Sequence, residues 1–123
     1  MRLDTMGTLL TIRDAAQYIV EDTEGISYAA FVDDRLTRQA VERNFIIIGE
    51  AVNRLRRHDP VVAARISANP EIIGMRNVLI HIYDDIDYLR VWSTIEKSVP
   101  ILLREAASLL EEGEREDEAS SSG

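Results

Sequence analysis

Residues 74–85 read Gly74-Met75-Arg76-Asn77-Val78-Leu79-Ile80-His81-Ile82-Tyr83-Asp84-Asp85 and concentrate the side chains of this sequence that are capable of chemistry. An arginine, an amide, a histidine, a tyrosine and two carboxylates stand there among aliphatic residues. Burying an unpaired polar group costs roughly 1 to 3 kcal/mol. These polar side chains must therefore be satisfied internally, line a cleft or face a partner.

The apolar residues of this segment recur at helical spacing. At about 100° per residue they form one continuous stripe, which consists of Ile72, Met75, Leu79, Ile82 and Ile86. We therefore predict a helix that Pro70 opens in its first turn and that ends around residues 84–87. The carboxylates clustered at that end would oppose the helix dipole, so they suit the N-terminus of the following helix better.

A second stripe on the same helix is polar. It contains Asn77, His81, Asp84 or Asp85, and Tyr88, which follow one another at spacings of three or four residues. His81 would have Asn77 one turn before it and a carboxylate one turn after it. Such neighbours can orient an imidazole ring and raise its basicity.

Arg76 and Tyr83 do not share the face of His81. Arg76 lies about 140° around the helix axis from His81, and Tyr83 about 200°. Either the long arginine wraps around the helix, or a second copy of the chain supplies the missing half of the site. We favour the second interpretation, because a symmetric pair of such helices would place two His81 and two Arg76 side chains in one groove.

The rest of the chain also shows helical periodicity. It predicts helices over residues 3–24, from a cap at Asp33 or Asp34 to about Arg57, and over 87–110, with short turns near 27–31 and 61–67. With the segment described above, this is an all-α, up-and-down bundle of four main helices plus one or two short helical turns. Pro100 should kink the last helix or remove one of its hydrogen bonds.

Gly49 and Glu50 interrupt the apolar pattern in the middle of the second long helix. Glycine costs about 1 kcal/mol relative to alanine there, which suggests the close approach of another helix. We expect Glu50 to have a structural role, such as pairing with an arginine, in preference to a catalytic one.

Composition and charge divide the chain into one domain over residues 1–110 and an acidic, Ser-rich tail over 111–123. The net charge is −8, and residues 111–118 contribute −5 of it through six carboxylates and Arg115. We expect the tail to be disordered. The domain is nearly balanced, and its best basic face for nucleic acid is formed by Arg54, Arg56, Arg57, His58 and Arg65.

Several classes of protein are disfavoured. The sequence has no cysteine and two separated histidines, so disulfides, thiol chemistry and a zinc site are not expected. No apolar run approaches the roughly 20 residues that span a bilayer. We expect a cytoplasmic protein with no membrane partner.

The motif Arg76-Asn77-x-x-x-His81-x-Tyr83 resembles the HEPN superfamily, specifically its HepT-like toxins. The similarity covers residues 1–110 and extends to Phe31-Val32-x-Asp34, Ala40-Val41-Glu42-Arg43, Ile48-Gly49-Glu50-Ala51 and Gly74-Met75-Arg76-Asn77. Many relatives carry a tryptophan just after the proline, where this chain has Glu71.

The resemblance implies a HEPN-like fold and a metal-independent endoribonuclease toxin of a type VII-like toxin–antitoxin module, with no cofactor. The active groove would lie between two copies of the motif helix in a homodimer, with RNA as substrate and no DNA expected. His81 would act as general base or acid, Arg76 would bind the scissile phosphate, and Asn77 would orient the ring or the substrate. Asp84 and Glu50 are possible supporting residues. Tyr83 matches the tyrosine that a cognate MNT-type nucleotidyltransferase antitoxin modifies with AMP.

An alternative function remains open at this point. The chain could be a noncatalytic helical partner of a nucleotidyltransferase, with the same groove holding a nucleotide or a protein loop. His81 would then be a satisfied structural histidine, Arg76 would pair with Asp84 or Asp87, and Tyr83 would be an interface aromatic.

Overall fold

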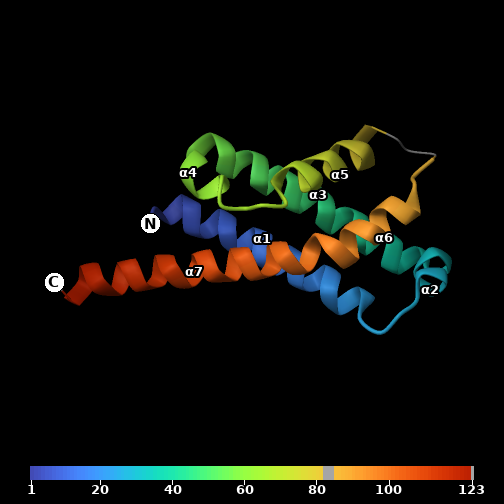
Figure 1. The fold of residues 1–123 in the computed structure, drawn as a ribbon, viewed down its shortest axis with the longest axis horizontal. Helices are drawn as coiled ribbons and strands as arrows, with labels where there is room; N and C mark the ends of the chain where they lie inside the picture. The colour runs from blue at the N-terminus through green and yellow to red at the C-terminus, as the bar shows by residue number, and fades with distance from the viewer. Residues whose placement is uncertain (82–84, 123) are drawn as a thin grey trace.

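The computed structural model describes residues 1–81 and 85–122 and is all-α, as predicted (Figure 1). Within these residues it contains α1 (Leu3–Thr23), α2 (Tyr28–Asp33), α3 (Arg35–His58), α4 (Pro60–Ala63), α5 (Asn69–His81), α6 (Tyr88–Lys97) and α7 (Val99–Ser122). The bundle has four long elements when α6 and α7 are counted together, with α2 and α4 as the short turns. No helix in the described part of the chain is long and apolar enough to cross a membrane.

The long helices pack side by side around one core. α1 lies between α3 and α7, and α5 packs on the other side of α3 (Figure 1). The largest fully buried side chains include Leu9, Ile12, Ile19, Phe45, Ile48, Ile72, Met75 and Leu102. They come from α1, α3, α5 and α7, so α3 is held from two sides and can position the polar residues on its surface.

The short α2 closes one end of the bundle. Ser27 caps it by accepting a hydrogen bond from the Ala30 amide, and Phe31 is fully buried. The ring of Phe31 lies 5.2 Å from that of Trp92 on α6 and 6.2 Å from that of Tyr88, measured between centroids. These aromatic contacts hold the beginning of α6 against the bundle.

The predicted last helix is divided at Ser98. α6 ends with Ser98 as its C-cap, and α7 begins at the next residue, one position before Pro100. Proline lacks the backbone N–H that a continuous helix would need at this point, and its ring crowds the preceding turn. The expected effect of Pro100 is thus seen as a boundary between two helices.

α7 continues to Ser122 through the acidic segment, which we expected to be a disordered tail. Two contacts hold its first part. Arg65 donates to Glu112 at 2.9 Å, and Gly113 lies so close to the Met6 sulfur that an added Cβ would overlap with it. Composition alone indicated too few apolar groups for order, but glycine lets the helix itself approach α1.

The described part of the motif helix, α5, runs to His81. The predicted end around residues 84–87 falls partly outside the described residues, and residues 85–87 have no helical assignment. Asp87 instead caps α6 by accepting from the amides of Leu89 and Arg90 at 3.1 and 3.3 Å. The carboxylate therefore stabilises the N-terminus of the following helix, as its charge indicated.

Candidate active site

Gly49 and Arg76 lie at the closest approach of α3 and α5. Gly49 is buried, and a Cβ built on it would overlap with Cβ and Cγ of Arg76. The prediction that another helix approaches this glycine is confirmed. The approaching residue is Arg76 of the motif. Because Gly49 has no side chain, Cβ and Cγ of Arg76 can lie directly against the backbone of α3.

Polar contacts then direct the Arg76 side chain, which is 25% exposed. Its Nη1 donates to the side-chain oxygen of Asn77 at 3.1 Å, and its Nη2 lies 3.8 Å from an Oε atom of Glu50. Its Nε is buried without a hydrogen-bond partner. Glu50 thus pairs with an arginine as expected, while the guanidinium retains unused donors, which suits the binding of an oxyanion.

Asn77 and His81 lie one turn apart on α5, and both are exposed. His81 is the last described residue of α5. Because Arg76 lies about 140° around the axis from His81, the helix turns the imidazole away from the Arg76–Glu50 pair. Arg76 thus contacts Asn77 and Glu50, while His81 is exposed one turn beyond Asn77 and about 140° around the helix from Arg76.

The remaining predicted site residues have different outcomes. Tyr83 and Asp84 lie outside the described residues. Asp85 has no helical assignment. Tyr88, which we placed on the same stripe as His81, belongs to α6, where its hydroxyl donates to Glu42 of α3 at 2.9 Å. The prediction that Tyr88 shares a helix face with His81 is therefore wrong, because α5 and α6 are separate helices.

A hollow of about 270 Å³ lies beside Arg76. It is lined by Arg76 of α5 and by Glu50, Asn53, Arg54 and Arg57 of α3. The four residues of α3 are spaced by three, one and three positions, so they share one face of that helix. Arg54 and Arg57 belong to the basic face predicted from the sequence, whereas Asn53 was not predicted. The helical spacing from Glu50 would have indicated it.

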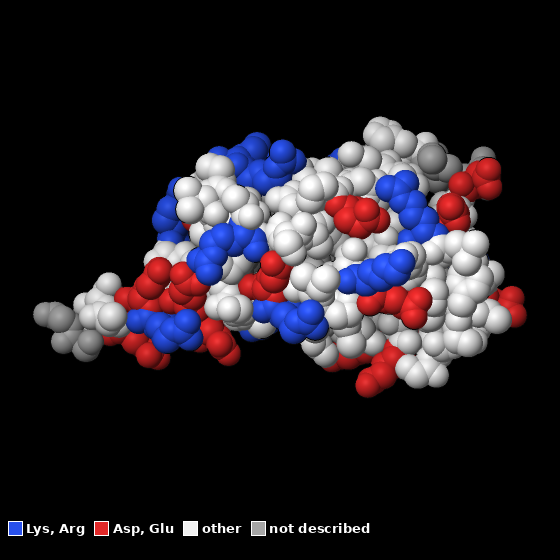
Figure 2. Space-filling view, viewed as in Figure 1, with Lys and Arg blue, Asp and Glu red and all other residues white. Residues whose placement is uncertain are grey.

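The other predicted basic residues lie elsewhere. Arg56 lines a different hollow, formed with residues 63–73, and Arg65 is paired with Glu112. His58 is exposed at the end of α3, and its backbone oxygen accepts from Arg2 at 2.7 Å. Figure 2 shows basic side chains over the end of the molecule where α4 lies and acidic ones over the protruding end of α7. Only part of the predicted basic face thus adjoins Arg76.

Comparisons with known proteins agree on one family. A family model described as "Ribonuclease HepT-like" matches residues 12–109. The chain is 35% identical over 106 residues to "Putative RNase MJ1380" of Methanocaldococcus jannaschii, which covers 83% of this chain and 93% of that protein. It is also 35% identical over 95 residues to "Probable ribonuclease HepT" of Thermococcus cleftensis, with 74% and 82% covered.

Proposed function

Because the chain belongs to the HepT-like ribonuclease family, we propose that it is an endoribonuclease toxin that needs no metal ion and builds its active site from two copies of α5. The observation that carries the proposal is the separation of Arg76 and His81 on different faces of that helix. A second copy can bring its own His81 to the Arg76 of the first, which one chain does not do alone.

The side chains suit cleavage by the neighbouring ribose. The 2′-oxygen attacks the phosphorus as its proton passes to His81 of the second copy, the P–O5′ bond breaks, and the leaving oxygen takes that proton from the same imidazolium. Arg76 binds the non-bridging oxygens, where charge accumulates in the transition state. Asn77, which already accepts a hydrogen bond from Arg76, keeps the guanidinium aimed at the phosphate.

The test is cleavage of RNA by purified protein in the presence of a chelator. We expect Arg76→Ala and His81→Ala each to lose activity while retaining the helical circular dichroism of the wild type. Mixing the two inactive variants should restore up to about a quarter of the wild-type rate, because exchanged dimers contain one intact pair. Wild-type protein that leaves RNA whole would favour the noncatalytic binding partner, and failure of the mixture to recover would contradict a shared site.

Regulation by a cognate MNT-type nucleotidyltransferase antitoxin is part of the same proposal. The Tyr83 hydroxyl attacks the α-phosphorus of ATP, a Tyr–O–AMP bond forms, and pyrophosphate leaves. The added phosphate brings negative charge to the motif segment and repels an RNA backbone. Tyr83→Phe should therefore retain cleavage and escape inactivation. Mass spectrometry that finds AMP on the variant would contradict the assignment.

A further inference from the structure

The hollow beside Arg76 carries an excess of positive charge. Three guanidinium groups and one carboxylate line it, and that carboxylate, on Glu50, is 56% exposed and already 3.8 Å from Arg76. Within residues 1–81 and 85–122, neither Arg54 nor Arg57 takes part in an ion pair. Among the described residues, the hollow thus has two cations, Arg54 and Arg57, that no ion pair neutralises.

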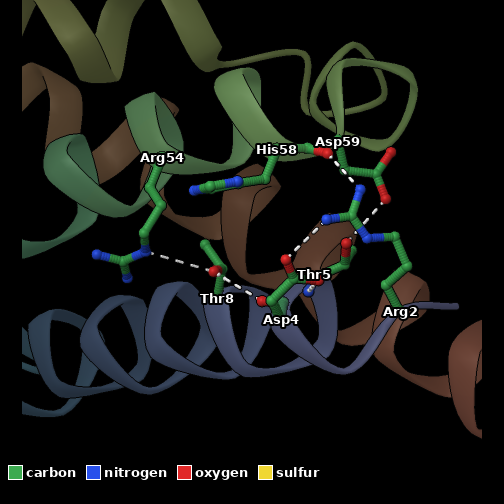
Figure 3. A network of polar contacts seen from close by, with 7 residues as sticks. All are labelled: Arg2, Asp4, Thr5, Thr8, Arg54, His58 and Asp59. Atoms are coloured by element: carbon green, nitrogen blue, oxygen red, sulfur yellow. Dashed lines mark hydrogen bonds and ion pairs between the residues drawn. The ribbon is translucent and has the colours of Figure 1, made fainter.

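Two carboxylates drawn with Arg54 in Figure 3, those of Asp4 and Asp59, bind other partners. Asp4 pairs with Arg2 at 2.8 Å, and Asp59 accepts from the Thr5 hydroxyl at 2.8 Å and from the Val62 amide. Arg54 reaches this network only through a 3.5 Å contact from its Nε to the Thr8 hydroxyl. The contact fixes the stem of Arg54 without neutralising it, so its outer nitrogens remain available to an anion.

The chemistry of the lining selects the kind of anion. Arginine forks bind phosphate oxygens with two parallel hydrogen bonds, and the Asn53 amide adds a neutral donor. The five lining residues include no aromatic ring on which a base could stack. The site therefore suits a backbone phosphate better than a nucleobase.

We propose that Asn53, Arg54 and Arg57 form an RNA phosphate subsite, which holds the phosphodiester next to the one that Arg76 binds. The inference rests on the proposed function, because Arg76 links the hollow to the cleaved bond. α3 would thus bind the RNA and set its position along the site, while α5 supplies the residues that cleave it. Neither α3 arginine touches the reacting atoms, so their loss should raise KM and leave kcat nearly unchanged.

The test measures binding of a fluorescent RNA oligonucleotide with a 2′-O-methyl group at every ribose, which the proposed reaction cannot cleave. We expect Arg57→Gln and Arg54→Gln each to weaken binding about 3- to 10-fold at 0.1 M salt and to flatten the dependence of log K on log salt by about 0.7. Arg57→Lys should keep most of that slope because it keeps the charge.

Arg56→Gln is the matched control. It removes the same charge from the neighbouring position of the same helix, but Arg56 lines the other hollow. We expect its salt slope to stay close to that of the wild type. Equal effects of Arg56→Gln and Arg57→Gln would overturn the inference, since net charge alone would then explain both.

The outcomes also separate this inference from the proposed function. If the wild type cleaves RNA and Arg57→Gln behaves as Arg56→Gln does, only the subsite is refuted. If the oligonucleotide binds through Arg57 but natural RNA is not cut, the subsite stands and the nuclease proposal fails. A wild-type protein that does not bind the oligonucleotide would overturn the subsite in either case.

Discussion

The Cβ and Cγ atoms of Arg76 occupy the space that a methyl group would take at Gly49. We predict that Gly49→Ala lowers RNA cleavage about as severely as Arg76→Ala, because α3 and α5 must separate and the guanidinium moves with them. Overpacking costs about 1–3 kcal/mol and is offset by about 1 kcal/mol of helix propensity. Cleavage assays and chemical denaturation measure the two effects separately.

Gly7→Ala provides the control for this substitution. Gly7 lies in α1, and no atom approaches within 4 Å of a Cβ built there. It should gain about 0.5–1 kcal/mol of stability with unchanged cleavage. A Gly49→Ala protein with wild-type activity would show that the close approach does not position Arg76.

Tyr88 anchors the start of α6 to α3 through its hydrogen bond to Glu42. Burial, together with Glu42, raises the pKa of the Tyr88 phenol above 10.0. The folded state therefore favours the neutral phenol, and this contribution to stability is complete below pH 10 and is lost as pH rises through the folded pKa. The ultraviolet difference titration of wild type minus Tyr88→Phe should have its midpoint above 10.0, and a midpoint at or below that value would contradict the contact.

Asp87 caps α6 immediately after the motif segment. Asp87→Ala should destabilise the protein by about 1 kcal/mol, because two amides at the start of α6 lose their acceptor. Asp87→Asn retains an oxygen acceptor and should lower the free energy of unfolding by only about 0.3 kcal/mol. Urea denaturation of the three proteins measures the difference, and equal stability of the Ala and Asn variants would indicate that the side-chain cap contributes nothing.

The Arg65 guanidinium donates a hydrogen bond to Glu112 and lowers the pKa of that carboxyl from its ordinary value of 4.5. The folded state favours the carboxylate, so the contact is fully present above pH 4.5 and is lost as pH falls through the folded pKa. NMR titration of the Glu112 side chain should give a lower midpoint in the wild type than in Arg65→Gln. The effect on global stability should be small, since the pair is exposed, and identical midpoints would show that the pair does not form in solution.

Local rules predicted most of the fold from the sequence. Asp34 caps α3 through the Thr37 amide, and the buried positions of α3, from Val41 to Leu55, follow the expected helical spacing. The extent of α7 was not predicted, because it depends on Arg65 and Met6, which are distant in the sequence. Sequence spacing does not report such tertiary contacts.

Only part of the candidate site was predicted from the sequence, because the rest also depends on tertiary contacts. Gly49 indicated that a helix approaches, but which residue fills the space follows only from the packing of α3 on α5. The angular separation of Arg76 and His81 follows from helix geometry and needs no tertiary information. The hollow and its Asn53 become visible only when both helices are placed together.

The ordered end of α7 gives one end of the molecule two electrostatic flanks. α4 and the acidic stretch of α7 lie at the same end (Figure 1), and Arg65, just after α4, forms an ion pair with Glu112 of α7. A long polyanion that approaches this end should be repelled on the α7 flank and attracted on the α4 flank (Figure 2). The electrostatic field thereby restricts the orientation in which the polyanion approaches before any contact forms. This restriction would be lost if α7 ended at Leu110, because the acidic residues beyond it cause the repulsion.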